Sequence, residues 1–242
     1  MEEKKNLLGI IGGMGTQATA CFYKVLHDLQ SVASEQEYLD VLLYSMPSIP
    51  DRTAYITGQS GDSPLKHLIH AARTLEHAGS SCIVFPCATS HFFYADLVKA
   101  VNIPVLNMLD ETACYTKECG FMKVFLLATD GTLKGSSFHK AFGRQAIEVM
   151  VPQDGMQADL MDIIYDIKRG AVVSADILDP IIAEAFAAGA DAVVLGCTEL
   201  CVFTGDSRDK TIRHSSIQNS AVINIIEVLA EASISFFKGT FK

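Results

Sequence analysis

The feature that most constrains the fold is an alternation of short apolar runs with longer segments of helical periodicity. This alternation is typical of parallel strands joined by helices, because a parallel connection needs a crossover of about a dozen residues. The chain has 242 residues and is 49% hydrophobic, which is enough for a sizeable core. The expected strands are 7–13, 41–46, 82–86, 105–108, 123–129, 147–152 and 191–196, and the expected helices are 16–33, 63–78, 90–101, 110–119, 135–144, 155–169, 175–188 and 218–236.

A faint internal repeat adds a second constraint. The segments AGSSCIVFPCAT (78–89) and AGADAVVLGCTE (188–199) align without a gap, and Ala-Gly, Val and Cys coincide. In each copy a helical pattern precedes a buried strand, and the cysteine comes just past that strand. Position therefore separates Cys87 and Cys197 from the other cysteines, most of which are expected to be ordinary small core residues.

The repeat predicts two similar Rossmann-like α/β lobes, each a mainly parallel sheet flanked by helices and related by a pseudo-twofold axis. The openings LLGIIGGMGT (7–16) and VFLLATDGT (124–132) are also loosely alike. We assign 1–115 plus 214–242 to the first lobe and 116–213 to the second. Ligands of open parallel sheets lie beyond the carboxyl ends of the strands, so both cysteines are expected at one cleft between the lobes.

Charge and composition exclude several classes of protein. The formal charge is −9 with no lysine- or arginine-rich run, which argues against a nucleic-acid partner. No apolar run is long enough for a membrane span, and the start of the chain does not resemble a signal peptide, so a cytoplasmic protein is expected. The seven cysteines form no disulfide framework and no zinc-type spacing, which predicts free thiols and no metal site.

Two opposed strand-end thiols suggest a specific chemistry. A cysteine between a strand and a helix meets unpaired backbone N–H groups and the positive end of a helix dipole, both of which favour a thiolate. One thiolate can then remove a proton from a carbon while the opposite thiol delivers a proton to the other face. No cofactor is needed if the site stabilises the carbanion electrostatically. The alternative is that Cys87 and Cys197 are only packed core residues.

Five segments carry a resemblance to a known family. In chain order they are GIIGGMGTQAT (9–19), MPSIPDRT (46–53), PCATSH (86–91), IPVLNM (103–108) and GCTEL (196–200). With these segments the sequence resembles the aspartate/glutamate racemase family, specifically its aspartate racemase branch. The resemblance implies a cofactor-independent amino-acid racemase of two Rossmann-like lobes, usually a homodimer, in which Cys87 and Cys197 take the places of the acid/base cysteines.

The resemblance also implies a clamp for the substrate's side-chain carboxylate. Arg52, in IPDRT, matches an arginine associated with that carboxylate, and a guanidinium offers it paired donors. Lys168 resembles a lysine that shares this work in aspartate-selective members. Two cations favour a dicarboxylic amino acid, with aspartate first and glutamate second.

Further contacts are expected around the two cysteines. Thr89, Ser90 and Thr198 offer hydroxyl or N–H donors to the α-carboxylate, and Met14 is expected to touch the ligand through the backbone around it. Glu199 is either an acceptor in the site or a first-turn acid of a helix.

The sequence departs from the family pattern at three positions. Ala88 stands where the first cysteine motif usually has an asparagine whose amide helps to hold the amino-acid head group. Thr16 stands where proline is common, and His214 where the family often has an acidic residue. Ala88 bears most directly on function, because its side chain offers neither donor nor acceptor. His91, four residues past Cys87, is expected to pack rather than to act in catalysis.

Three alternatives remain open from sequence alone. GMGTQA (13–18) matches a relaxed dinucleotide fingerprint, although the acidic residue expected after the second strand is missing. A dicarboxylate isomerase of maleate type would use the same two cysteines and the same clamp. A non-catalytic amino-acid-binding protein would explain Ala88.

Overall fold

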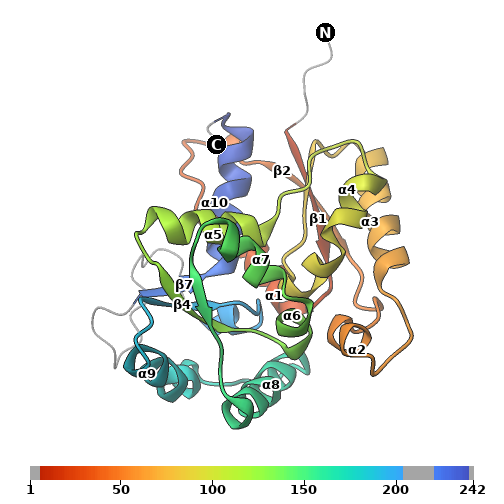
Figure 1. Cartoon of the computed structure of the whole chain (residues 1–242). Helices are drawn as coiled ribbons and strands as arrows, with labels where there is room; N and C mark the ends of the chain where they lie inside the picture. Colours follow the sequence, from red (N-terminus) through yellow and green to blue (C-terminus); the bar gives the residue numbers. More distant parts are fainter. Residues whose placement is uncertain (1–5, 204–220, 240–242) are drawn as a thin grey trace.

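Two parallel sheets, each flanked by helices, form the protein, as the alternation in the sequence predicts (Figure 1). The computed structural model describes residues 6–203 and 221–239. The first sheet has the order β2-β1-β3 and the second the order β5-β4-β6-β7, and every pair is parallel. The strands are β1 (Leu7–Gly12), β2 (Asp40–Ser45), β3 (Cys82–Val84), β4 (Lys123–Leu127), β5 (Glu148–Met150), β6 (Ala192–Leu195) and β7 (Ala221–Asn224).

Helices connect and cover the strands in both halves of the chain. They are α1 (Thr16–Asp28), α2 (Arg52–Thr57), α3 (Leu65–His77), α4 (Tyr94–Ala100), α5 (Met108–Glu118), α6 (Asp130–Gly135), α7 (Ser137–Arg144), α8 (Asp154–Lys168), α9 (Asp179–Ala187) and α10 (Ile225–Phe237). Short 3-10 helices are η1 (Glu35–Glu37), η2 (Ala88–Phe93), η3 (Ala175–Leu178) and η4 (Leu200–Phe203). The two that matter for function are η2 and η4, because they follow β3 and β6.

The two sheets share one connectivity. In the first, Val105 makes a single parallel bridge to Ile83 of β3, at the place that β7 takes beside β6 in the second. The expected strand 105–108 is only this bridge, because Asn107 already caps α5 by accepting from two backbone N–H groups. Asn224 caps α10 in the same way. Both sheets are thus followed by an asparagine cap and a helix.

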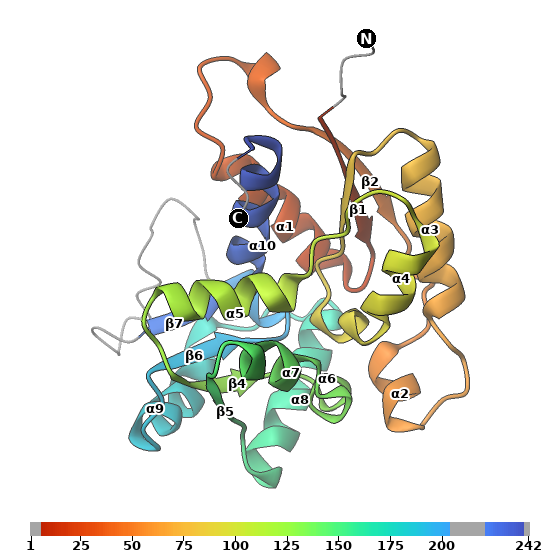
Figure 2. The same ribbon diagram turned by 45° about the horizontal axis from the view of Figure 1, so that its top comes forward.

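Each of the two capped helices, α5 and α10, packs against the other half of the chain. In Figure 2, α10 lies beside α1, which follows the first strand of the first sheet, and α5 runs past α7 of the second half. The two helices also pack against each other. The described part of the segment 214–242, which is expected in the first lobe, contacts both halves: β7 pairs with β6, whereas α10 packs against α1. His214 lies outside the described residues.

Three local predictions are wrong in detail. The expected helix 218–236 begins only at Ile225, because the residues just before it pair as β7. The expected helix 135–144 is two helices, α6 and α7, separated at Ser136, whose φ of 55° lies in the left-handed region. Helix α2, which begins at Arg52, is absent from the predicted elements.

The main apolar core is shared by both halves. One cluster of buried side chains joins β1, α1 and α10 to β4, β6 and α7, and a smaller cluster lies between the first sheet, α3 and α4. The strands β3 and β6, which precede the two cysteines, are buried along their whole length, which matches their continuous apolar sequence. Within the described ranges, every helix is too short or too polar to cross a membrane.

Candidate active site

Two loops of closely similar geometry follow the strands β3 and β6. In the first, the Cys87 carbonyl accepts from Ser90 N at 3.2 Å; in the second, the Cys197 carbonyl accepts from Leu200 N at 3.0 Å. Each loop then enters a 3-10 helix, η2 or η4. Both cysteines are buried, at 5% and 4% exposure. The internal repeat is therefore a structural equivalence at the carboxyl ends of β3 and β6.

A hydroxyl faces the first thiol. Ser90 Oγ lies 3.1 Å from Cys87 Sγ and 3.2 Å from Met14 Sδ, so the single hydroxyl proton of Ser90 can be donated to either sulfur atom. Met14 belongs to the glycine-rich turn after β1. There Gly13 has φ 91°, and an added Cβ would come within 2.5 Å of the Met46 backbone. The turn that brings Met14 to Ser90 thus requires glycine.

A carboxylate faces the second thiol. Cys197 Sγ donates to Glu199 Oε2 at 2.9 Å, and Thr198 Oγ1 lies 3.5 Å from the same oxygen. Burial raises the pKa of the Cys197 thiol well above its ordinary value, and the Glu199 carboxylate raises this pKa further. Lys168 acts on the pKa in the opposite direction. The protonated thiol is therefore the favoured form of Cys197.

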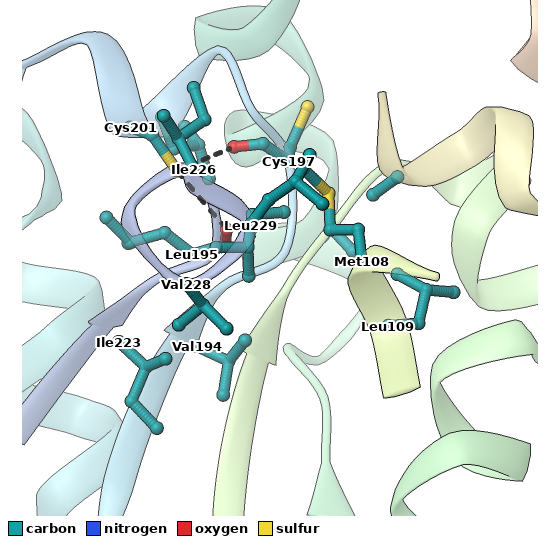
Figure 3. Close-up of a cluster of buried hydrophobic side chains, with 14 of the residues drawn as sticks. Met108, Leu109, Val194, Leu195, Cys197, Cys201, Ile223, Ile226, Val228 and Leu229 are labelled. Carbon is teal, nitrogen blue, oxygen red and sulfur yellow. Dashed lines mark hydrogen bonds between the residues drawn. The ribbon is translucent and has the colours of Figure 1, made fainter. Parts of the chain in front are cut away.

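Residues four positions past the cysteines hold the two loops. His91 Nδ1 lies 3.0 Å from the Cys87 carbonyl oxygen, and its Nε2 accepts from Met108 N at 3.1 Å. In the second loop, Cys201 Sγ donates to the carbonyls of Cys197 and Leu195, at 3.8 and 3.6 Å (Figure 3). Burial lowers the pKa of His91 to about 4, so its ring is neutral near pH 7. These contacts agree with the packing role expected of His91.

Lys168 interacts electrostatically with both thiols. It is the last residue of α8, with Nζ 5.1 Å from the centre of the Tyr165 ring. Burial by itself lowers the pKa of this lysine, but its electrostatic interactions with Glu199, Cys197 and Cys87 outweigh the effect and the pKa is raised. The side chain is therefore a cation whose potential acts on both cysteines.

Arg52 lies close to Lys168, at the first turn of α2. Its Nη1 donates to the carbonyls of Ile49 and Pro50 at 3.2 and 3.1 Å, and its charge acts on Lys168. The Arg52 side chain is buried, and within the described residues its Nε has no hydrogen-bond partner. A buried guanidinium N–H without a partner is costly, and a carboxylate would satisfy it.

The contact between α8 and α2 explains why Lys168 and Arg52 are close enough to interact electrostatically. The Tyr165 hydroxyl, one turn before Lys168, lies 3.5 Å from Asp51 Oδ1. Asp51 is the N-cap of α2 and accepts from Ala54 N at 2.7 Å. The end of one helix is thereby held against the start of the other, although the two helices are far apart in the sequence.

Glu199 has a second carboxylate oxygen that faces the glycine-rich turn. An added Cβ on Gly15 would lie 2.8 Å from Glu199 Oε1. This oxygen is buried and accepts no hydrogen bond from any described residue. Ala88 is buried within the apolar core, at 3% exposure. The site therefore has no amide at position 88, but it has an unpaired carboxylate oxygen beside the turn.

Thr89 makes a contact that the sequence did not suggest. Its Oγ1 lies 3.0 Å from Thr129 Oγ1 and 2.9 Å from Thr132 Oγ1, and the latter two lie 3.0 Å apart. The three buried hydroxyls join η2 to the start of α6, which follows β4 of the second sheet. The only signal for Thr129 and Thr132 was the loose likeness of their loop, 124–132, to the glycine-rich turn.

The structure thus brings most of the sequence-predicted residues together. Hydrogen bonds, close contacts and charges link Met14, Ser90, Cys87, Lys168, Cys197, Thr198, Glu199 and Arg52. Thr89 instead bonds to the two threonines of the second half. The seven cysteines, all of them within the described residues, are thiols rather than disulfides. Among those same residues, no group of three or more potential ligands is arranged to hold a metal ion.

Comparison with solved structures identifies the class of protein. The fold matches the aspartate racemase of Picrophilus torridus with a TM-score of 0.80 and 28% identity, covering 96% of this chain and 94% of that one. An aspartate racemase homologue from Pyrococcus horikoshii matches with a TM-score of 0.75 and 27% identity, over 98% and 100% of the two chains. The architecture is that of the amino-acid racemases, isomerases that work without a cofactor.

Sequence comparison then identifies the family. The model of the family described as Asp/Glu/Hydantoin racemase matches residues 11–232. The broad-specificity amino-acid racemase RacX of Bacillus subtilis is 26% identical over 207 residues, which is 80% of this chain and 86% of that protein. This chain belongs to the Asp/Glu/Hydantoin racemase family.

Proposed function

We propose that the protein racemises an acidic amino acid, aspartate first and glutamate second, with Cys87 and Cys197 as its two acid/base groups. The observation that carries this proposal is the equivalence of the two strand-end thiols, both of which interact electrostatically with the Lys168 ammonium. Two equivalent, buried thiols beside one cation are suited to an anionic substrate whose α-carbon lies between them. Proton removal by one thiolate and proton return by the other thiol would invert that carbon.

The substrate class follows from the cations. Arg52 Nε is buried and has no partner among the described residues, and Lys168 is the nearby second positive charge. A side-chain carboxylate would satisfy the guanidinium N–H and share the ammonium, whereas a neutral side chain would leave the buried donor unsatisfied. Selectivity for a dicarboxylic substrate is therefore expected from this clamp. The structure from Picrophilus torridus, which the chain resembles, is that of an aspartate racemase.

Glu199 is the residue that we propose replaces the amide missing at Ala88. Its Oε1 is unpaired among the described residues and lies against Gly15, whereas Oε2 already accepts from Cys197. We assign Oε1 the task of accepting a hydrogen bond from the substrate's α-ammonium group, in place of the missing amide. A charge-assisted hydrogen bond of this kind is stronger than one from a neutral amide.

The decisive experiment measures exchange of the α-proton. The purified protein is incubated in deuterated buffer with each enantiomer of aspartate, glutamate, alanine and lysine. Deuterium at the α-carbon of aspartate, together with loss of optical rotation, is the expected result. If no amino acid acquires label while both cysteines remain reduced, the proposed reaction is wrong.

Two further measurements separate the isomerase and binding-protein alternatives from the racemase. A maleate-type isomerase would convert maleate while leaving aspartate unlabelled, and an amino-acid-binding protein would bind aspartate in calorimetry without labelling it. Arg52→Lys keeps the charge but loses the paired donors, so it should weaken turnover of aspartate more than that of alanine. Arg144→Lys, at an exposed arginine of α7, is the matched control.

Three broader expectations also remain proposals. Seven cysteines without a disulfide suit a reducing compartment, which supports a cytoplasmic location. The resemblance to the aspartate racemase branch supports a homodimer, which light scattering at several protein concentrations would measure directly. The presence of one sheet in each half supports a division into two lobes near residue 116.

A further inference from the structure

The two equivalent thiols have opposite hydrogen-bonding partners. Cys87 Sγ lies 3.1 Å from a hydroxyl, that of Ser90, whereas Cys197 Sγ lies 2.9 Å from a carboxylate, that of Glu199. The two cysteines are almost equally buried, at 5% and 4% exposure. Their exposed fractions are therefore alike, whereas their polar neighbours differ.

The two neighbours favour different protonation states. A hydroxyl can donate to a thiolate, so Ser90 stabilises the charged form of Cys87. The other acceptor within reach of the Ser90 proton is a thioether, Met14 Sδ, which is weak. A carboxylate only accepts, so Glu199 holds a proton on Cys197, and this proton stays on sulfur because a thiolate is a stronger base than a carboxylate.

The other charges around the site do not remove the difference. The Lys168 ammonium acts on both thiols, and Arg52 is a second cation close to Lys168. The group that adds negative charge at Cys197 is Glu199, whose carboxylate raises the pKa of that thiol beyond the effect of burial. Glu199, two positions past the second cysteine, is therefore the carboxylate neighbour that, in addition to burial, opposes a thiolate at Cys197.

We propose that the free enzyme rests with Cys87 as the base and Cys197 as the acid, and that Glu199 fixes this arrangement. The catalytic consequence rests on the proposed function. The substrate's α-C–H bond breaks, its proton goes to the Cys87 sulfur, and the electron pair stays on carbon. The Cys197 S–H bond then breaks, and its proton forms the new C–H bond on the opposite face. Cys87 afterwards releases its proton to solvent, and Cys197 takes one up.

Alkylation tests the resting state without any substrate. Because only the thiolate reacts, iodoacetamide labelling followed by peptide mass spectrometry reports the thiolate fraction of each cysteine. In the wild type near pH 7.5, Cys87 should react at least about tenfold faster than Cys197.

Two variants test the roles of the polar neighbours. In Glu199→Gln, Cys197 should react about tenfold faster than in the wild type, and the midpoint of its pH profile should move to lower pH. Ser90→Ala should slow the reaction of Cys87 while leaving that of Cys197 unchanged. A shift of the pH midpoint reports protonation, which a change in packing alone would not move.

A matched carboxylate provides the control. Glu111→Gln removes a half-buried carboxylate of α5 that acts on Cys114, so it should change the labelling of Cys114 and leave that of Cys197 unaltered. Equal labelling of Cys87 and Cys197 in the wild type, including an equal failure to label, would overturn the proposal. So would an unchanged Cys197 profile in a folded Glu199→Gln protein. These outcomes are independent of deuterium exchange, so the resting-state proposal and the racemase proposal can fail separately.

Discussion

The loops after β3 and β6 have similar backbone geometry but differ in the chemistry of their side chains. Both place a buried cysteine past a fully buried strand, and both hold its carbonyl through the residue four positions later. That residue is His91 in one loop and Cys201 in the other. The fold therefore supplies two equivalent positions, and the side chains around them make the positions unlike.

The largest expected effect comes from removing one thiol at a time. Cys87→Ser and Cys197→Ser should each reduce racemisation by about 10²–10⁴-fold, the usual contribution of a general acid or base. Each variant should still exchange the α-proton of one enantiomer, and the enantiomer should differ between the two variants. Deuterium exchange followed by chiral chromatography measures both quantities.

Cys114→Ser is the control for the cysteine variants, because Cys114 is an exposed thiol of α5. It should racemise at the wild-type rate. If either site variant also retained that rate, the equivalence of the two loops would be structural only.

The second prediction uses the difference between His91 and Cys201. His91 has a folded-state pKa of about 4 against an ordinary 6.5, so below pH 6.5 the unfolded chain binds a proton that the folded protein does not. The free energy of unfolding should therefore fall as the pH drops from 6.5 to 4, by about 3 kcal/mol from this residue. Cys201 has a raised pKa and makes no such contribution in acid.

Urea unfolding at a series of pH values tests this difference. His91→Gln keeps a donor and an acceptor at the position but does not titrate, so its stability should vary less steeply with pH than that of the wild type. An identical slope in the two proteins would show that His91 is not the responsible group.

The third prediction compares two helix glycines of the second half. An added Cβ at Gly131 would lie 2.7 Å from Thr53 Cα, whereas at Gly143 it would meet nothing within 4 Å. Gly131→Ala should cost about 1–3 kcal/mol and raise KM for aspartate, because α6 packs against the helix that begins with Arg52. Gly143→Ala should be neutral or stabilising by up to about 1 kcal/mol. Thermal unfolding and steady-state kinetics measure both.

The smallest effect tests the equivalence of the two asparagine caps. Asn107→Ala and Asn224→Ala each remove an acceptor for two backbone N–H groups at a helix start. Each should reduce the free energy of unfolding by about 1 kcal/mol. Similar losses in denaturant unfolding would support the structural repeat, and a much larger loss at one cap would show that the two helices contribute unequally.

Sequence patterns were sufficient for the parts of the fold that depend on continuous burial. The runs that become β1, β3, β4 and β6 are short and almost uniformly apolar, which is typical of buried parallel strands. Strand β7 was missed because its four residues lead directly into the apolar α10, where a short strand and a buried helix look alike. Helix α2 was missed because it has only six residues.

The site was predictable to the extent that it repeats or matches a motif. The positions of Cys87 and Cys197 followed from the repeat, and that of Arg52 from its resemblance to a family motif. The contact of Thr89 with two threonines of the second half did not follow, because it depends on how the two halves pack together. The choice left open for Glu199 also needed coordinates, since its 2.9 Å contact with Cys197 is what distinguishes an acceptor from a helix-start acid.

The crossed packing of α5 and α10 has a consequence for the symmetry of the molecule. If each half were a separate polypeptide, its last helix would have to find its apolar partner on another molecule. Two such halves would form an exchanged dimer, in which identical elements are traded between copies. The single chain has the connectivity of that dimer with its two subunits joined. Once they are joined, the two cysteine positions no longer have to carry identical side chains around them. One thiol can then have a serine beside it and the other a glutamate, which two identical subunits could never arrange.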